Sequence, residues 1–231
     1  SPQQGGAGEY RVVAPEVVPI PDGSGRWRMY YECCPGTQAE ASTIRSAVSA
    51  DGLKWTVESG DRLSGSGGSF NAPRVLALDD GRCRMYCSDQ VEGIVSAISE
   101  DDGYNFTLEA GRRIVRELPY EAHVAYAPEV LRIEGGGYRM YYAGYRDPTY
   151  TCILTAVSDD GLTWHKGSEP VILPGGPYDS AKCSEMAVIR LPQVEGQPPR
   201  YRMFWEGCDG TGPDRRGVWR VVSATSANDD E

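Results

Sequence analysis

Apolar residues alternate with small or polar residues in short stretches along the whole sequence, and Gly, Asp or Pro bounds most of these stretches. A period of two is typical of β-strands, because successive side chains of a strand point to opposite faces of its sheet. No stretch has the 3.6-residue period of an amphipathic helix. The pattern therefore predicts an all-β protein.

The predicted strands fall into four copies of one unit, marked most clearly by an Arg-Met-aromatic segment. The four segments read RWRMYYE (26–32), RCRMYCS (82–88), GYRMYYA (137–143) and RYRMFWE (200–206). They contain four of the five Met residues of the chain, Met29, Met85, Met140 and Met203, at intervals of roughly 60 residues. We interpret this segment as one strand of a repeated sheet, with its Met and aromatic side chains packed between neighbouring sheets.

Each copy predicts four strands, of which the Arg-Met-aromatic segment is the second. The first strands are APEVVPI (14–20), APRVLAL (72–78), APEVLRI (127–133) and the divergent EMAVIRL (185–191). The third strands are IRSAVS (44–49), IVSAIS (94–99), ILTAVS (153–158) and VVSATS (221–226). The fourth strands surround an aromatic residue in DGLKWTV (51–57), DDGYNFTL (101–108) and DGLTWHK (160–166).

Four-stranded antiparallel sheets repeated around an axis make a β-propeller. We predict one propeller domain over 1–231, with repeats at about 10–66, 67–118, 119–174 and 175–231. The last copy stops at SANDDE, where its fourth strand should begin, and the N-terminal residues could supply that strand. Four and five blades both stay open. An incomplete ring would expose blade edges and favour pairing between copies of the chain.

Charge and composition exclude several classes of partner. The net charge is −10 and is spread along the chain, whereas a nucleic-acid binder needs a basic surface. No apolar run approaches the roughly 18 residues of a membrane span, so we expect no membrane partner. The seven cysteines include no C-x-x-C pair. Buried thiols in a reducing compartment are favoured, with long-range disulfides as the alternative, and the lack of a visible signal peptide also favours the cytoplasm.

The sequence predicts no metal and no cofactor. The chain has only two His, His123 and His165, and neither is paired with the other. A calcium loop with alternating Asp residues is missing as well. We expect His165 to be exposed on an outer strand.

The combination of APEV, YRMYY and ILTAVSDDGLTW resembles the five-bladed propeller glycosidases and phosphorylases of families 32, 43, 62, 68 and 130. The resemblance implies a carbohydrate-active enzyme of the glycoside hydrolase type. Such an enzyme would act on a small glycoside or an oligosaccharide, in a central pocket, by paired-carboxylate acid/base chemistry. SEDDGYNF (99–106) also fits a turn of sialidase-type propellers. We assign structural roles to the turn residues Asp51, Asp101 and Asp160.

The family places its acids just before a Pro at the start of first strands, and the matching positions are Ala14, Ala72, Ala127 and Glu185. Only Glu185 carries a carboxylate, and it resembles the general acid of the family. A catalytic partner would have to be recruited elsewhere. The candidates are Glu16 and Glu129, two residues further along their strands, and Asp179, six residues before Glu185. Because Arg74 occupies the same slot as Glu16 and Glu129, ion pairs between blades are the alternative interpretation.

Substrate contacts are expected where the repeat varies, near the starts of the first strands. We select six candidates for substrate binding: Phe70, Asn71, Arg74, His123, Tyr126 and Ser184. The aromatic rings could stack on a sugar, and a titratable imidazole could move protons or contact substrate. Two alternatives to the hydrolase stay open. One is a carbohydrate-binding propeller that has lost catalysis, and the other is an enzyme that uses the same pocket for a non-sugar substrate.

Overall fold

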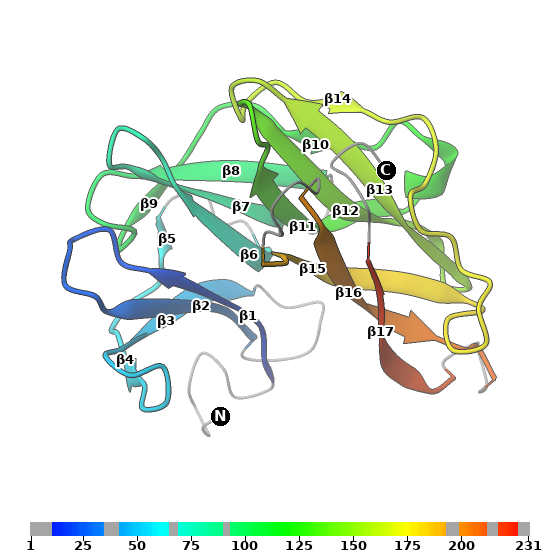
Figure 1. Ribbon diagram of the computed structural model, residues 1–231, viewed down its shortest axis with the longest axis horizontal. Coiled ribbons are helices and arrows are strands. Elements are labelled where there is room, and N and C mark those ends of the chain that lie inside the picture. Colours follow the sequence, from blue (N-terminus) through cyan, green and yellow to red (C-terminus); the bar gives the residue numbers. More distant parts are fainter. Residues whose placement is uncertain are drawn as a thin grey trace. The chain divides into compact units, whose positions relative to one another are not determined.

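The computed structural model describes residues 11–34, 42–64, 69–89, 93–192, 199–211 and 217–225. Their secondary structure consists of β-strands and one 3-10 turn, η1 (Pro119–Glu121), so the all-β prediction is confirmed (Figure 1). Within these ranges no helix has the length and apolar character needed to cross a membrane. The strand that we expected from the N-terminal residues and the segment SANDDE both lie outside the described residues.

The chain divides into two compact units, 1–114 and 115–231, and each holds two of the four copies. In the first unit, the first copy is an antiparallel sheet in the order β1 (Arg11–Pro19), β2 (Trp27–Cys34), β3 (Thr43–Ser49) and β4 (Thr56–Val57). The second copy consists of β6 (Phe70–Ala77), β7 (Cys83–Asp89), β8 (Gly93–Ser99) and β9 (Phe106–Leu108). Two short strands complete this second sheet, β5 (Leu63–Ser64) beside β9 and β10 (Ile114–Val115) beside β8.

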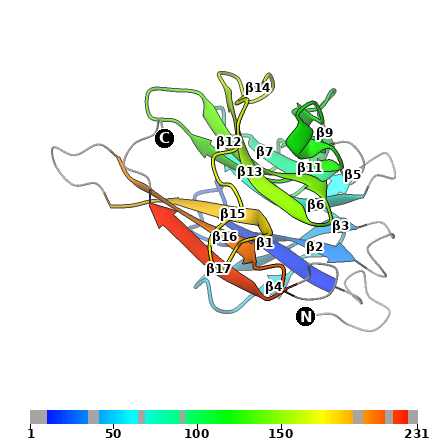
Figure 2. The same ribbon diagram turned by 90° about the vertical axis from the view of Figure 1, so that its right-hand side faces the viewer.

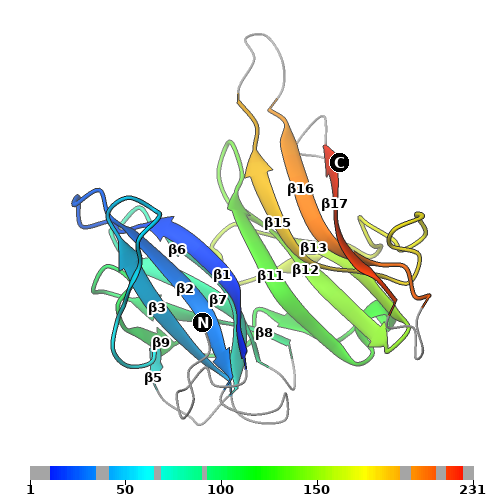
Figure 3. The same ribbon diagram turned by 90° about the horizontal axis from the view of Figure 1, so that it is seen from below.

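The second unit repeats the arrangement. Its first copy consists of β11 (Val124–Arg132), β12 (Tyr138–Asp147), β13 (Tyr150–Ser158) and β14 (His165–Lys166). The last copy contributes β15 (Lys182–Arg190), β16 (Tyr201–Cys208) and β17 (Trp219–Thr225), which lie side by side in Figures 2 and 3. A parallel bridge between Thr151 and Lys182 joins the two copies into one sheet. Four-stranded antiparallel copies are thus confirmed for the first three repeats.

The first strand of every copy starts earlier than the sequence suggested. The observed strands begin at Arg11, Phe70, Val124 and Lys182. Our expectation that Ala14, Ala72, Ala127 and Glu185 mark strand starts was therefore wrong. The pairing with the second strand continues past each of these positions through a β-bulge, so each lies inside its strand.

The Arg of the repeated segment ties the second strand of its copy to the chain that follows the fourth strand. Nε of Arg28 donates to Glu58 at 2.8 Å, and Nε of Arg84 donates to Glu109 at 2.9 Å. In both copies a third-strand serine hydroxyl donates to the same carboxylate at 2.6 Å. Buried arginines need such partners, so Arg28 and Arg84 have a structural role.

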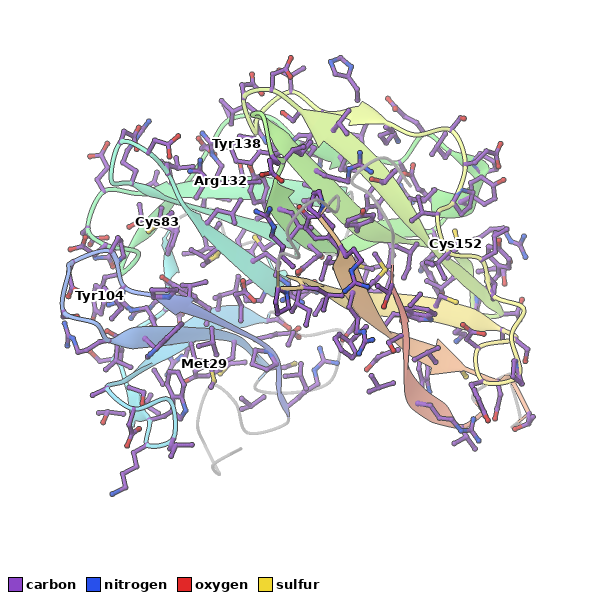
Figure 4. The ribbon with its side chains drawn as sticks, in the orientation of Figure 1. Met29, Cys83, Tyr104, Arg132, Tyr138 and Cys152 are labelled. Carbon is purple, nitrogen blue, oxygen red and sulfur yellow. The ribbon has the colours of Figure 1, made fainter. Side chains whose placement is uncertain are left out.

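Apolar side chains of the repeated segments form much of the interior. Met85 and Met140 are fully buried, whereas Met29 and Met203 are half-buried. All seven cysteines are buried free thiols, as expected. Figure 4 labels Arg132 and Tyr138 at the turn between β11 and β12, where the guanidinium lies 5.7 Å from the centre of the ring.

The Asp-Gly turns before the fourth strands have the structural role that we predicted. In the third copy, Oδ1 of Asp160 accepts hydrogen bonds from the backbone N–H groups of Leu162 and Thr163, both at 2.7 Å. Gly161 adopts φ +73°, which glycine reaches without steric cost. These hydrogen bonds lower the pKa of Asp160 to about 2. His165, which follows this turn, is exposed as predicted.

Candidate functional site

Each first strand contains one extra residue relative to its partner strand. In the last copy Ser184 pairs with Glu206 and Ala187 pairs with Phe204, so three steps along β15 match two along β16. The other three copies have the same register shift at the same position. Such a bulge re-aims one side chain relative to the rest of the strand.

The first residue of each bulge has a positive φ although it is not glycine. The angles are +50° at Ala14, +49° at Ala72, +50° at Ala127 and +40° at Glu185. Residues other than glycine pay about 1–2 kcal/mol for this conformation. Because three alanines share this conformation, the positive φ is a feature of the repeat and not of Glu185 alone. The distinctive feature of the last copy is the carboxylate that stands there.

Glu185 and Glu206 bring two carboxylates together on neighbouring strands. Glu206 lies on β16 directly opposite Ser184, the residue before Glu185. Both glutamate side chains are exposed to solvent. They can therefore be reached by a molecule from solution, unlike the buried Glu121 and Glu129 of the same unit.

The pair has unequal proton affinity. The adjoining strands shield Glu206 from part of the surrounding water, and the negative charge of Glu185 disfavours a second charge nearby. Together these effects raise the pKa of Glu206 from 4.5 to about 7. One carboxyl group of the pair therefore carries a proton near neutral pH. A protonated carboxyl beside an ionised one is the arrangement that acid/base catalysis on a glycosidic bond requires.

The half-buried Tyr126 and the buried Ser184 belong to the same cluster. The two side chains are hydrogen-bonded, and Ser184 is only 2% exposed. Removal from water raises the pKa of Tyr126 well above its usual range, and the charges of Glu185 and Glu206 raise it further. The hydroxyl group of Tyr126 therefore keeps its proton at ordinary pH.

His123 joins this group through Tyr145. Its ring packs edge-on against that of Tyr145, with centroids 5.1 Å apart. The backbone N–H of His123 donates to the backbone carbonyl of Tyr145 at 3.0 Å. Tyr145 in turn acts electrostatically on Tyr126. His123 is exposed. Of the predicted candidates, the second unit thus groups four: His123, Tyr126, Ser184 and Glu185.

Asp179 packs against Gly207, the residue after Glu206. This buried carboxylate accepts hydrogen bonds from the backbone N–H of Gly176 at 2.9 Å and from Nε1 of Trp205 at 3.2 Å. A Cβ added to Gly207 would lie 2.8 Å from Cβ of Asp179 and 2.8 Å from Cγ2 of Val222. Position 207, directly after Glu206, therefore has room only for glycine. Asp179 stays a prediction as a catalytic partner, but its contacts favour a structural role.

Glu16 and Glu129 also make internal contacts. Oε2 of Glu16 lies 3.9 Å from Nε of Arg74, which is the interaction between copies that we weighed as the alternative. Oε1 of Glu129 accepts a hydrogen bond at 2.9 Å from the backbone N–H of Val188 on β15, and Glu129 is 8% exposed. A catalytic role for Glu16 or Glu129 stays a prediction. Their observed contacts favour structural roles.

The remaining candidates lie in the first unit. Phe70 is 7% exposed and belongs to an apolar core cluster with Tyr30 and Met85. Asn71, half-buried, pairs with Ser88 across β6 and β7. NH1 of Arg74 donates to the carbonyl of Pro73 at 2.8 Å. The packing of Phe70 favours a core role, while a substrate-binding role for Asn71 and Arg74 stays a prediction.

Glu206 was missed by the sequence analysis, although the repeat contains a signal for it. Its equivalents in the other second strands are Glu32, Ser88 and Ala143. The copies differ at this position of the second strand as they do before the first strand, and this variation is the signal that marks Glu206. Among the described residues, no group of three or more His, Cys, Asp or Glu side chains is placed to hold a metal ion.

Comparison with solved structures identifies the architecture. An N-acetylgalactosamine deacetylase from F. plautii, solved with blood group B trisaccharide, is 14% identical, with a TM-score of 0.71 over 94% of this chain and 72% of that one. An exo-1,5-alpha-L-arabinanase from a bovine ruminal metagenomic library is 18% identical, with a TM-score of 0.67 over 92% and 73%. A thermostable family-43 glycoside hydrolase is 19% identical, with a TM-score of 0.71 over 95% and 72%. No protein family model and no curated protein matches the sequence.

These similarities confirm the predicted β-propeller fold and the resemblance to the five-bladed propeller glycoside hydrolases of family 43. At 14–19% identity they show the fold alone. The similar structures include both a deacetylase and an arabinanase, so the fold does not determine the reaction. The reaction has to be argued from the side chains of the site.

Proposed function

We propose that the protein is a carbohydrate-active enzyme of the propeller glycoside hydrolase type, and that it acts on a small glycoside through the carboxylates of Glu185 and Glu206. The observation that carries the proposal is the exposed carboxylate pair of the last copy. Glu185 stands at the bulge position that alanine occupies in the other three copies, and Glu206 lies on the neighbouring strand. The fold supports the proposal, because proteins of this architecture act on arabinans and other glycosides.

The geometry suits this chemistry in two respects. Hydrolysis of a glycoside needs a proton for the leaving oxygen and a base or nucleophile on the other side of the bond. The raised pKa of Glu206 supplies one group that is protonated near pH 7 beside one that is ionised. Tyr126 adds a hydrogen-bond donor at the edge of the pair, and His123 and Tyr145 add ring surface for a sugar.

The test is hydrolysis of aryl arabinofuranosides, xylosides, fructosides and mannosides by the wild type and by Glu185→Gln. We expect the variant to lose about 10³-fold in kcat/KM on the substrate that the wild type accepts. Glu134→Gln is a matched control, because Glu134 is an exposed glutamate of the same unit whose ion pair with Arg190 contributes little stability. Equal activity of wild type and Glu185→Gln would remove Glu185 from the mechanism.

A wild type that hydrolyses none of these glycosides would contradict the proposed activity. Calorimetric titration with the corresponding free sugars would then separate the two alternatives. Sugar binding without hydrolysis would favour a binding propeller, and no sugar binding would favour an enzyme for a non-sugar substrate.

A further inference from the structure

We propose that Glu206, on the second strand of the last copy, is a catalytic residue that delivers the proton to the leaving group, and that Glu185 is its ionised partner. This inference rests on the proposed function and assigns the roles within its site. The resemblance to propeller glycosidases instead implies that Glu185 is the acid. Pairing in the sheet and the substitutions around Glu206 support the assignment.

The first argument is position. Glu206 lies opposite Ser184, and the bulge that follows re-aims Glu185, so the two carboxylates come from adjacent strands of one sheet. The pairing of β15 with β16 and of β16 with β17 holds the backbone of Glu206 from both sides. A rigid strand is a better support for a proton donor than a loop.

The second argument is the replacement of the groups that hold the equivalent glutamate. In the first copy Glu32 has an ion pair with Arg11 and accepts a hydrogen bond at 3.0 Å from Oγ of Ser42. The pairing registers place Lys182 at the position of Arg11 and Trp219 at the position of Ser42. In the last copy these two residues contact each other, with Nζ of Lys182 5.7 Å from the centre of the Trp219 ring.

Besides Lys182, three charged or titratable residues on the described strands of this unit have a partner or a raised pKa. On β17, NH1 of Arg220 donates to Oδ2 of Asp209 at 2.8 Å. On β11, Tyr126 is hydrogen-bonded to Ser184, and its pKa is raised by burial. On β12, burial and the charge of Asp147 raise the pKa of Tyr145. Glu185 is the charged group that acts on Glu206, and its negative charge favours the protonated form of Glu206.

The reaction balances as a hydrolysis. The bond between the anomeric carbon and the leaving oxygen breaks, its electron pair goes to that oxygen, and Glu206 supplies the proton. A water molecule bonds to the anomeric carbon through its oxygen and gives one proton to Glu185. The products are a free sugar and an alcohol. Proton exchange with solvent returns Glu206 to its protonated form and Glu185 to its ionised form.

The experiment compares Glu206→Gln, Glu185→Gln and Glu134→Gln on two glycosides of the accepted sugar, one with a 2,4-dinitrophenyl and one with a methyl leaving group. Dinitrophenolate departs without a proton, whereas methoxide needs one. We expect Glu206→Gln to lose at least 10²-fold in kcat on the methyl glycoside and less than 10-fold on the dinitrophenyl glycoside. We expect Glu185→Gln to lose activity on both.

The pH profile supplies a second measurement. Wild-type kcat on the methyl glycoside should fall as the pH rises through about 7, because Glu206 then loses its proton. The double variant Lys182→Arg/Trp219→Ser rebuilds the surroundings of Glu32 and should move this fall to lower pH. A carbon-13 NMR titration of the carboxyl groups checks the same shift on the folded protein without any turnover.

Three results would overturn the assignment. Equal losses of Glu206→Gln on both glycosides would show that this residue does not act through leaving-group protonation. A Glu206→Gln variant as active as Glu134→Gln, while Glu185→Gln is inactive, would refute the role of Glu206 and leave the proposed function intact. A wild type inactive on both glycosides would refute the proposed function together with this inference.

Discussion

Glu32 in β2 and Glu206 in β16 occupy the same position of the repeat, and their surroundings differ in charge. Glu32 is 4% exposed and is held by Arg11 and Ser42. Glu206 is exposed and lies near the carboxylate of Glu185. The two strands pair with their neighbours in the same register. The backbone therefore places a glutamate at the same position in both copies, and the neighbouring side chains determine whether it meets an arginine or a second carboxylate.

The difference arises from three substitutions within one pattern of strands. Ala14 corresponds to Glu185, Arg11 to Lys182 and Ser42 to Trp219. The first substitution adds a negative charge. The second exchanges the arginine that pairs with Glu32 for a lysine that lies against the Trp219 ring, and the third removes the hydroxyl group that donates to Glu32. A site on a repeat protein can thus be built without any change of fold.

We expect the largest effect on stability from substitution of the residue that follows each glutamate. This residue is Cys33 in β2 and Gly207 in β16. Gly207→Ala should lower the free energy of unfolding by about 3 kcal/mol, because the added Cβ meets Cβ of Asp179 and Cγ2 of Val222, both at 2.8 Å. Cys33→Ala removes one buried sulfur atom and should cost only about 1 kcal/mol. Urea denaturation of both variants measures the contrast. Equal losses would mean that the packing beside Glu206 is no tighter than beside Glu32.

A substantial part of the molecule could be predicted from the sequence, because the fold depends on local and repeated signals. The alternation of apolar residues gave the strands, and the Asp-Gly turns, such as that of Asp160 and Gly161, gave the connections between third and fourth strands. The bulge was not predicted. A register shift depends on pairing between two strands, and an Ala-Pro sequence within one strand does not reveal it.

The candidate site was predicted only in part for a similar reason. Glu185 stood out because it differs from its three equivalents. Glu206 becomes prominent only when its register with Ser184 and the contact between Lys182 and Trp219 are known. The carboxylates selected by spacing, Glu16 and Glu129, lie two residues past the bulge residue and contact Arg74 and the backbone of Val188. Counting residues along a strand cannot show which side chains meet across a sheet.

The second prediction compares the two glutamates directly. Glu32→Gln should lower the free energy of unfolding by about 2 kcal/mol, because it weakens a buried contact to a charged group and leaves Arg11 without its ion pair. Glu206→Gln should cost no stability near pH 7, because the neutral amide replaces a carboxyl group that binds a proton there and avoids the second negative charge that Glu185 disfavours. The measurement is the urea midpoint of both variants in the same buffer. A loss of 2 kcal/mol in Glu206→Gln would mean that Glu206 is held as Glu32 is, and the proposed difference between the two copies would be wrong.

The smallest effect is the contribution of Glu206 to the pH dependence of stability. Its pKa is about 7 in the folded protein and 4.5 as the ordinary value, so the folded state binds more protons between these limits. This contribution to stability is therefore complete below about pH 4.5 and is lost as the pH rises through 7. Because the side chain is exposed and solvent screens its charge, we expect a loss of only about 0.5 kcal/mol between pH 5 and 8. Carboxylates with lowered pKa values, such as Asp160 at about 2, titrate below this range and do not obscure it.

The difference in unfolding free energy between wild type and Glu206→Gln, measured at pH 5 and pH 8, isolates the contribution of Glu206. A difference that stays constant, or that favours the wild type more at pH 8, would show that Glu185 does not raise the proton affinity of Glu206, and the contrast between the first and last copies would then be limited to packing.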